Sequence, residues 1–444
     1  MVLLQRVAMY WKIRVLKFAG RGFAAAMLMI AAGNAMAQMP ALIQGIEVPE
    51  ATVPERQSVG ERPRPDYDPL GMRAASFLIF PAADFDATYN SNVFATRAGT
   101  KSDLYGSLRP SINVLSDWNS NALVFHADGE LRRYANLVSE NQSNGEAAVS
   151  GRLDQAYNVF FTGGAGYKRA HEDRSSPDST FNQKNPTEYQ VASGRLGYVH
   201  ESGTVGFRLD GGNDSYWYSN GHTNTGATVP ETDRNRNELG LTPRVSYEFI
   251  PGYHAFIKAP LNDRIYDSSR DQNGFKRNSH GYEIDAGTAV GLGEIVNGEV
   301  FAGYFQQTYD DNRLKSPSGV TFGGNVLWNI TELTSIKGAV SRSVQELTPN
   351  LAPASSYVST DASVTIEHEL LRNIILALTG VYSNDAYQGI TRTDNLYQGT
   401  FGIRYLMNRN LWLALEATYR DRESNVPGAA FNQAIIAANV RLQY

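Results

Sequence analysis

The chain has 444 residues, enough for two or three soluble domains or for one large barrel. Its net charge of -5 and its lack of any basic patch with interleaved aromatic residues argue against nucleic-acid binding. The absence of cysteine excludes disulfides, thiolate metal sites and cysteine nucleophiles. The 40 glycines and 24 tyrosines favour a sheet protein with many turns over a helical enzyme.

Residues 1–37 have the pattern of a secretory signal peptide. A basic stretch precedes an apolar run from Phe23 to Ala32, and Ala35-Met36-Ala37 then supplies small residues for cleavage before Gln38. The alternative, a membrane anchor, is disfavoured because this run is too short for a hydrocarbon core of about 30 Å. No later apolar run reaches about 18 residues. We therefore expect either an exported soluble protein or an integral barrel in the outer membrane of a Gram-negative bacterium.

The next segment, residues 38–75, is rich in proline and carries mixed charges. Proline at this density favours an extended chain that packs poorly. We expect a solvated periplasmic leader or linker here. The alternative is a segment that docks on a periplasmic partner or folds into the lumen of a barrel.

From residue 76 onward, apolar and polar residues alternate in one segment after another. In residues 238–249, for example, Leu239, Leu241 and Val245 share one face, and charged residues occupy the other. This period of two, without helical periodicity, is typical of strands that have different surroundings on their two faces.

The connections between these segments fall into two classes. Nine are long and polar, at about residues 92–102, 136–145, 172–187, 219–234, 268–278, 310–318, 348–356, 384–392 and 421–429. Eight are short, near Asn119, Gln155, Gly203, Gly252, Val296, Thr331, Leu371 and Asn408. Short periplasmic turns opposite long outer loops are typical of outer-membrane barrels. The sequence therefore predicts an all-β fold, a closed antiparallel transmembrane β-barrel over residues 76–444 with about eighteen strands, sixteen being the alternative.

Aromatic residues recur near the predicted strand ends. Eight of the nine outward strands carry a tyrosine shortly before the long loop: Tyr89, Tyr134, Tyr167, Tyr216, Tyr266, Tyr309, Tyr382 and Tyr419. Trp118 and Trp328 lie beside short turns. Interfacial aromatic residues collect where one end of the ring is apolar and the other is wet. We expect these residues to form two aromatic girdles, which a soluble sandwich would not need.

The last segment ends on an aromatic residue. Val440, Leu442 and Tyr444 lie on the apolar face of an alternating stretch that reaches the C-terminus. Alone, this stretch also fits the last strand of a soluble sandwich. As the last strand of a barrel it would pair with the first and remove both sheet edges. Its aromatic end resembles the signal that the barrel-assembly machinery reads.

The polar face of the predicted strands should line the lumen. A barrel of this size is wide enough for an aqueous channel. We expect a charge-balanced wall in which acids and bases pair across strands, and the alternative is a transverse field or a sugar-binding track. The candidate lumen-lining residues are Arg109, Asp128, Glu130, Arg132, Arg208, Asp210, Arg244, Glu248, Lys258, Glu283, Asp285, Asp361, Glu367, Arg404, Glu416 and Arg441.

The chain from roughly Arg62 to Tyr444, the whole predicted barrel, resembles a known family. The matching segments are Ser76–Pro81, Tyr89–Thr96, Lys101–Asp103, Ser116–Trp118 and Asn439–Tyr444. They are similar to the outer-membrane β-barrel porin family often encoded with capsular or exopolysaccharide genes. The resemblance implies a barrel and a link to polysaccharide secretion, and it carries over no catalytic residue. An acidic pair expected after the first tyrosine is Asn90-Ser91 here, which puts any cation site there in doubt.

Enzyme and metal motifs are weak. His171, His200 and His368 each precede a glutamate, but none has a second histidine four residues later, and no Gly-x-Ser-x-Gly elbow occurs. We expect no enzyme activity, no cofactor and no metal site. The predicted function is an outer-membrane channel linked to export of capsular polysaccharide or exopolysaccharide. The alternatives are a general diffusion porin, a ligand-binding barrel without an open pore and a loop-built hydrolase. Expected partners are membrane lipid and lipopolysaccharide, the barrel-assembly machinery and periplasmic polysaccharide-export proteins.

Overall fold

The computed structural model describes residues 57–177, 179 and 183–444. The predicted signal peptide, residues 1–37, and residues 38–56 of the leader lie outside this part of the chain. No helix of the described residues is long and apolar enough to cross a membrane.

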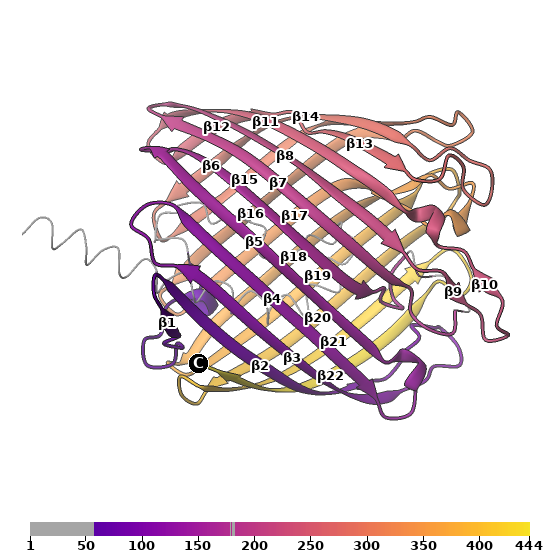
Figure 1. Cartoon of the computed structure of the whole chain (residues 1–444), viewed down its shortest axis with the longest axis horizontal. Helices are drawn as coiled ribbons and strands as arrows, with labels where there is room; N and C mark the ends of the chain where they lie inside the picture. The colour runs from indigo at the N-terminus through magenta and orange to yellow at the C-terminus, as the bar shows by residue number, and fades with distance from the viewer. Residues whose placement is uncertain (1–56, 178, 180–182) are drawn as a thin grey trace, which may run out of the picture.

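A single antiparallel sheet forms the wall of a closed barrel (Figure 1). Closure follows from the two partners of the first wall strand, which pairs with β3 on one side and with β22 on the other. Counted over the described residues, the wall has 18 strands, as predicted, and the pairing of its first strand with its last closes the barrel. In chain order they are β2 (Phe77–Asn90), β3 (Asp103–Ser116), β4 (Ala122–Tyr134), β5 (Gln142–Ala156), β6 (Val159–His171), β7 (Glu188–Ser202), β8 (Val205–Tyr218), β11 (Arg236–Ile250), β12 (Tyr253–Lys258) with β13 (Leu261–Tyr266), β14 (Ser279–Leu292), β15 (Val296–Tyr309), β16 (Ser318–Thr331), β17 (Thr334–Glu346), β18 (Ser356–Leu371), β19 (Ile374–Tyr387), β20 (Thr393–Leu406), β21 (Leu411–Ser424) and β22 (Phe431–Gln443).

One wall strand is interrupted. Both β12 and β13 pair with β11 on one side and with β14 on the other, so they are two halves of the same strand. Pro260 lies at the break and has no N–H to donate to the ladder. The strand therefore stops before the proline and resumes at Leu261.

Small elements decorate the two ends of the barrel. β1 (Met72–Ala74) forms a hairpin with the start of β2, and β9 (Gly221–His222) pairs with β10 (Thr228–Val229) within one loop. Short 3-10 helices occur at η1 (Val59–Glu61), η2 (Val138–Glu140), η3 (Thr232–Arg234) and η4 (Pro349–Leu351).

The predicted asymmetry of the connections is confirmed. Every predicted short turn lies in an observed turn or within two residues of one, as at residues 203–204 between β7 and β8. The long loops gather at the opposite end (Figure 1). Three loops are shorter than predicted, because β5 begins already at Gln142, β19 continues to Tyr387 and β21 continues to Ser424. The short-turn end is the periplasmic end, as in other outer-membrane barrels.

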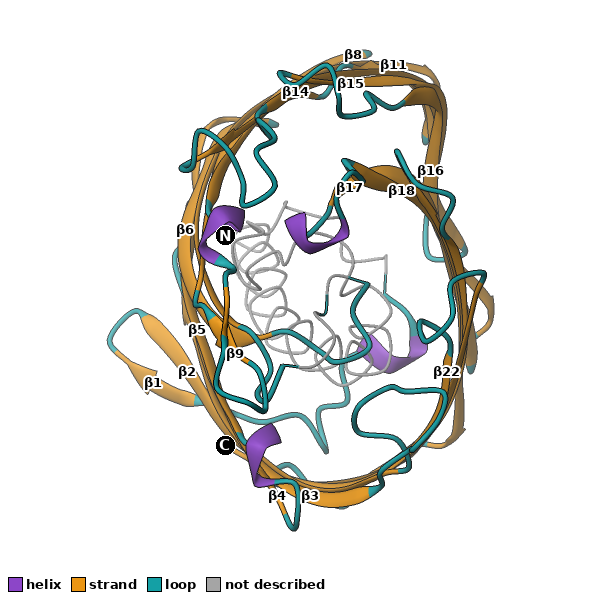
Figure 2. Cartoon of the chain, turned by 90° about the vertical axis from the view of Figure 1, so that its right-hand side faces the viewer, coloured by secondary structure: helices purple, strands orange, loops and turns teal. Residues whose placement is uncertain are grey.

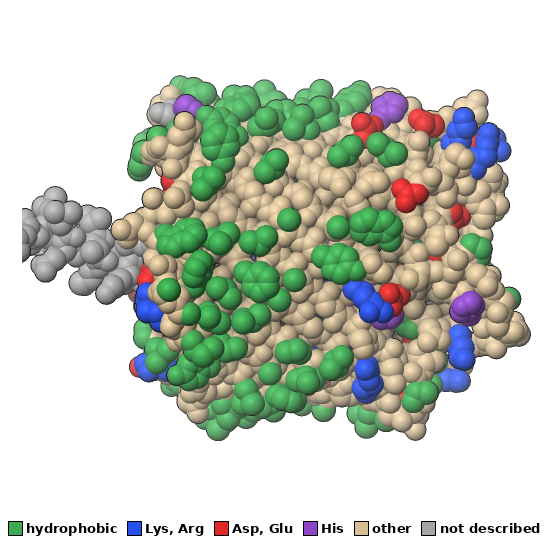
Figure 3. All heavy atoms as spheres, in the orientation of Figure 1, with side chains coloured by type: hydrophobic (Ala, Val, Ile, Leu, Met, Phe, Trp, Pro, Cys, Tyr) green, Lys and Arg blue, Asp and Glu red, His purple; other side chains and the backbone are tan. Residues whose placement is uncertain are grey.

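The outer surface carries the apolar half of the alternation. Leu196, Val300 and Ile257 are each more than half exposed, which in water would be unfavourable for so many apolar side chains. Figure 3 shows apolar side chains spread over the wall, whereas charged side chains gather toward the loop end. The wall therefore presents to lipid the face that the sequence predicts.

Only four of the eight predicted girdle tyrosines lie on the outer face of the wall. Tyr89, Tyr167, Tyr382 and Tyr419 are exposed on the outer face, where a girdle would lie. The girdle prediction is wrong for four others, which are buried and turned toward the interior: Tyr134, Tyr216, Tyr266 and Tyr309. The alternation of the strand explains the difference. Tyr266, for example, follows the outward-facing Ile265 directly, and so its own side chain points to the other face. Trp328 is exposed on the outer face, and Trp118 packs against Phe77 with ring centroids 5.7 Å apart.

The outer ends of β17 and β18 leave the wall. The ladder between β16 and β17 ends with the pair Gly323 and Ser341, although both strands continue toward the loops. Viewed from the loop end, the outer parts of β17 and β18 lie inside the oval ring formed by the other strands (Figure 2). We call this part of the chain, residues 342–358, the infolded segment.

Candidate functional site: a charged chamber in the lumen

The interior contains a chamber of about 840 Å³. Its lining comes chiefly from inward-facing residues of β2 to β8 and of β19 to β22, with further residues from the infolded segment. Pockets that bind small molecules have volumes of about 300–1,000 Å³, so the chamber has the size of a small-molecule site.

The predicted lumen residues divide into two groups. Seven of the sixteen line the chamber: Arg109, Asp128, Glu130, Arg132, Arg404, Glu416 and Arg441. The other nine are not part of its lining: Arg208, Asp210, Arg244, Glu248, Lys258, Glu283, Asp285, Asp361 and Glu367. Among these, Lys258 is 3.6 Å from Asp285, and Arg244 is 2.9 Å from Glu299, so this side of the interior forms its own ion pairs.

Charged groups in the wall pair in two directions. Across strands, Lys168 lies 3.4 Å from Glu146. Along one strand, Arg132 pairs with Glu130 at 2.8 Å, because residues two positions apart share a face. The sequence predicted only pairing across strands. The wall is therefore more tightly compensated than a cross-strand pattern alone would make it.

Several lining residues escaped the sequence prediction. Arg236 and Glu238 line the chamber and pair at 2.7 Å. They have the same parity as Arg244 on β11, and strict counting from that residue would have found them. Arg420 follows Glu416 at an even spacing on β21 and was open to the same argument.

The loop between β6 and β7 closes part of the outer end of the chamber. Arg174 forms an ion pair with the buried Glu140 at 2.8 Å. Arg422, which belongs to β21, donates to the carbonyl oxygen of Ser175 at 2.8 Å. The loop therefore reaches from β6 toward β21 and joins two parts of the wall that are distant in sequence.

Asp173 in this loop faces Arg420. Burial of the Asp173 carboxyl acts to raise its pKa, but the Arg420 guanidinium and the N–H and hydroxyl of Ser175 outweigh burial and hold the pKa below 3.8. Both Ser175 groups donate to Asp173 Oδ1 at 2.8 Å. The carboxyl is thus ionised at neutral pH and stabilises the loop in this position.

The infolded segment is held by one carboxylate. Glu346 accepts hydrogen bonds from Arg264 Nη1 at 2.6 Å, from the Tyr266 hydroxyl at 2.6 Å and from the Tyr309 hydroxyl at 3.0 Å. These donors come from β13 and β15, so β17 crosses the inner face of strands that are not its ladder partners. The two inward tyrosines therefore serve the infolded segment and not the membrane surface.

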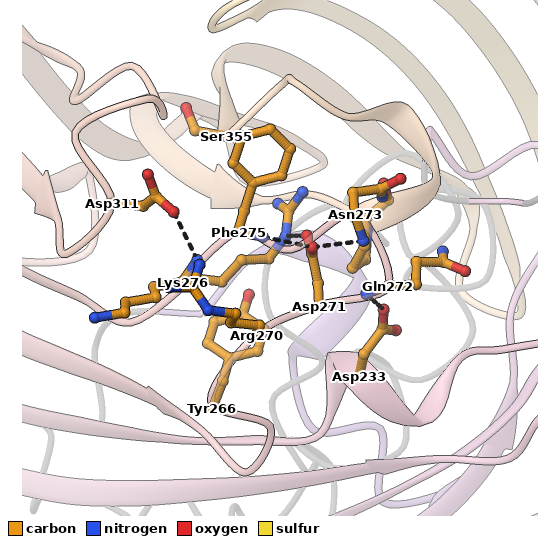
Figure 4. A network of polar contacts seen from close by, with 12 residues as sticks. Asp233, Tyr266, Arg270, Asp271, Gln272, Asn273, Phe275, Lys276, Asp311 and Ser355 are labelled. Carbon is orange, nitrogen blue, oxygen red and sulfur yellow. Dashed lines mark hydrogen bonds and ion pairs between the residues drawn. The ribbon is translucent and has the colours of Figure 1, made fainter.

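The loop after β13 contains a network of polar contacts centred on Asp271 (Figure 4), and it also contacts the tip of the infolded segment. Asp271 Oδ1 accepts the backbone N–H groups of Asn273 and Phe275, each at 2.9 Å, and its Oδ2 accepts from the fully buried Arg277 at 2.6 Å. These contacts of Asp271 set the conformation of the loop. The loop contacts η4 through Asn273, whose Nδ2 donates to the carbonyl oxygen of Pro349 at 2.9 Å.

A neighbouring loop supports the same network. Asp311 Oδ2 accepts the backbone N–H of Lys276 at 3.0 Å and pairs with Arg313 at 2.6 Å. The hydrogen bonds from Arg313 hold the pKa of Asp311 well below its usual value. The sequence predicts a polar outer loop at about residues 310–318, and within it Asp311 is buried.

The described part of the leader occupies the periplasmic end of the barrel. Val59 is fully buried, and its N–H donates to Ser335 Oγ at 2.7 Å. Further along, Arg64 pairs with Glu369 at 2.7 Å. We call residues 57–70 the leader segment. For buried residues such as Val59 and Arg64 the prediction of a solvated leader is wrong, and the alternative, a segment that folds into the lumen, describes them.

An apolar cluster receives the other end of the leader segment. Phe80, Leu406 and Trp412 are buried together, and Tyr67 packs against them. Trp412 Nε1 donates to the carbonyl oxygen of Tyr67 at 3.4 Å. Apolar residues on the lumen face are unusual for an aqueous pore, and the leader segment accounts for them.

One cluster on the wall has the composition of a cation site. His126, Asp128 and Glu146 each offer a ligand atom, and these atoms lie within 4.8 Å of one another. Lys168, 3.4 Å from Glu146, already supplies a positive charge there. His126 also bonds to Asn113 and Asp128, at 2.8 and 2.9 Å. The geometry is that of a compensated polar network.

A family comparison agrees with this architecture. Residues 64–444 match the model of a family described as Putative beta-barrel porin 2. No curated protein matches the chain in sequence. Solved structures with a similar course include OpdL of Pseudomonas aeruginosa (12% identity, 82% of this chain, 99% of that chain, TM-score 0.41) and a BenF-like porin of Pseudomonas fluorescens Pf-5 (10%, 83%, 99%, 0.44).

Proposed function

Because the chain belongs to the Putative beta-barrel porin 2 family, we propose that this outer-membrane barrel is a channel for hydrophilic solutes that takes part in export of capsular polysaccharide or exopolysaccharide. The observation that carries the proposal is the polar chamber of about 840 Å³ inside a closed, lipid-facing wall. The polysaccharide link is supported by the sequence resemblance at Ser76–Pro81 and Tyr89–Thr96.

The chemistry of the chamber suits a saccharide. Sugar hydroxyl groups both donate and accept hydrogen bonds, and the lining offers both kinds of partner, including Asn144, Thr418 and Tyr105. The paired charged side chains also offer hydrogen-bond donors and acceptors, and because opposite charges neutralise each other they create little net electric field. Extended saccharide chains would have to displace the leader segment at one end and the loop at Asp173 at the other.

The proposed partners follow from where each surface lies. Lipopolysaccharide would surround the outer loops, and periplasmic export proteins would meet the barrel beside the leader segment. The barrel-assembly machinery would read the C-terminal strand at Val440, Leu442 and Tyr444. These residues are exposed on the outer face, where another protein can contact them.

Two measurements test the proposal. Purified full-length protein in planar bilayers should give stable conductance steps, and a barrel that carries no current at any voltage or pH would contradict a channel. Deletion of the gene should impair secretion of surface polysaccharide, and the intact gene should restore it. Normal secretion in the deletion strain, together with conductance, would leave a general diffusion porin.

A further inference from the structure

Arg404 is placed differently from the other cations of the chamber. It belongs to β20, lines the chamber and is 9% exposed. Among the described residues, no hydrogen bond acceptor or carboxylate pairs with its guanidinium. Its contact is the face of Trp412, whose ring centroid lies 5.7 Å from the guanidinium carbon.

The other lining cations are compensated. Apart from Arg404 and Arg420, each Lys or Arg that lines the chamber has a carboxylate oxygen within 3.7 Å among the described residues. Arg420 donates to Gln398 at 2.7 Å and also acts on Asp173. Arg404 is therefore the one lining cation for which the described residues supply neither a carboxylate nor a hydrogen-bond acceptor.

The two acids that act electrostatically on Arg404, Glu367 and Asp84, are already engaged by other groups. Glu367 is engaged by Lys337 at 2.6 Å and by the N–H of Gly60 at 2.7 Å. Asp84 pairs with Arg441 at 3.7 Å. Arg441 and Arg64 also lie close enough to act electrostatically on Arg404. The inner end of the chamber thus has a surplus of positive charge.

Trp412 fixes the direction in which Arg404 points. The guanidinium of Arg441 also lies 5.7 Å from the centre of this ring, so one indole contacts both cations. The ring is held in turn by its hydrogen bond to Tyr67 of the leader segment. A guanidinium that is fixed and unpaired before the ligand arrives loses little freedom on binding.

We infer that Arg404 binds the carboxylate of a solute in the chamber, through the paired N–H groups of its guanidinium. The inference rests on the proposed channel function and names the class of solute as carboxylate-bearing. Guanidinium and carboxylate match in a planar, two-point geometry, which is why this pair recurs in recognition sites. The carboxylate could come from a uronic acid residue of a saccharide or from a small free acid.

Binding to the full-length protein in detergent tests the inference without any current measurement. Isothermal titration with sodium glucuronate, glucose and sodium acetate separates the carboxylate from the sugar ring. We expect glucuronate to bind and glucose to bind at least about tenfold more weakly, as for the loss of a charged hydrogen bond. Acetate binding as tightly as glucuronate would assign the site to small acids, and weaker acetate binding would assign it to a uronic acid.

Two variants at one position locate the site. Arg404→Gln should lower glucuronate affinity about 10- to 100-fold, and Arg404→Lys should retain part of it, because lysine keeps the charge but loses the two-point geometry. Arg208→Gln is the matched control, since Arg208 belongs to the inner wall outside the chamber and pairs with Asp210. Heat-modifiable migration on gels checks that each variant is a folded barrel.

Three results would overturn the inference. They are equal binding of glucuronate and glucose, no glucuronate binding at all, and unchanged affinity in folded Arg404→Gln. Failure of the channel proposal would look different, because a barrel without conductance could still bind glucuronate through Arg404. Conductance with normal affinity in Arg404→Gln would retain the channel and remove the site.

Discussion

The backbone N–H of Gly60 donates to Glu367 Oε2 at 2.7 Å, across 307 positions of sequence. Glu367 is fully buried, and its other oxygen lies 2.6 Å from Lys337 Nζ. One wall carboxylate of β18 thus joins a lysine of β17 to the leader segment. Because this contact lies at the periplasmic end, the leader segment occupies part of the opening.

Enlarging Gly60 should displace the leader segment. A Cβ at Gly60 would lie 2.9 Å from both carboxylate oxygens of Glu367, closer than such atoms approach. We expect Gly60→Val to raise single-channel conductance and to expose the bond after Glu61 to a glutamate-specific protease. Gly194→Val is the control, because a Cβ there meets nothing within 4 Å. Unchanged conductance and protection at Glu61 would show that the leader segment does not restrict the opening.

The sequence was sufficient for the wall. The period of two in stretches such as residues 238–249 follows from lipid on one face and the interior on the other, and each strand shows it locally. The short turns could also be predicted from local sequence. Gly252, for example, adopts a positive φ of 81° in a tight connection, a conformation that favours glycine. Strand number and direction then follow from counting.

The sequence was not sufficient for the chamber. Val344, Gln345 and Glu346 alternate no differently from residues that remain in the wall. Their inward course depends on Arg264 and Tyr266, 82 and 80 positions away, and no local pattern encodes such contacts. The same holds for Arg404. The alternation along β20 predicts that it faces the lumen, but it lacks a partner because Glu367 is bound to Lys337 and Gly60, which no local pattern shows.

Removing the carboxylate of Glu346 should release the infolded segment. In Glu346→Ala, Arg264 would lose its buried ion pair and the Tyr266 hydroxyl would lose its acceptor, while the Tyr309 hydroxyl would keep only the carbonyl oxygen of Ser355 at 3.4 Å. Breaking a buried pair from one side costs about 3–5 kcal/mol. We expect a loss of this size in the free energy of unfolding, measured by urea titration in lipid vesicles.

The matched control is Glu201→Ala, whose side chain is exposed near a periplasmic turn. Its effect should stay within about 0.5 kcal/mol. If Glu346→Ala were as stable as this control, the hydrogen bonds of Glu346 would not be what holds β17 inside the ring. An increase in conductance without loss of stability would show that the segment moves while the wall stays intact.

The loop at the outer end should respond to acid in a defined direction. The pKa of Asp173 is lowered in the folded protein, so its carboxylate contributes stability at pH values above the pKa that this group has in the unfolded chain. The contribution is lost as pH falls through the lowered pKa. We expect constant protection of the loop from proteolysis between about pH 5 and pH 8. Protection should disappear only in stronger acid, below the ordinary pKa of an aspartate side chain.

Asp173→Asn should remove this dependence by weakening the loop contact at every pH. The isosteric amide keeps an acceptor for Ser175 but loses the attraction to Arg420. Asp310→Asn, in another outer loop, is the control for a simple change of net charge. Loop protection that is lost between about pH 5 and pH 6 in the native protein would contradict a lowered pKa.

The final residue should matter for assembly more than for transport. Tyr444 is exposed on the outer face, and its N–H donates to the carbonyl oxygen of Pro81 at 3.1 Å, beyond the last ladder pair of β22 with β2. Deleting Tyr444 removes this closing hydrogen bond and the terminal aromatic ring. We expect the amount of heat-modifiable barrel in the outer membrane to fall severalfold, while the conductance of each assembled barrel is unchanged. Tyr444→Phe keeps both the ring and the N–H and should assemble normally. If the deletion assembled as well as Tyr444→Phe, neither the ring nor the closing hydrogen bond would be needed to complete the barrel.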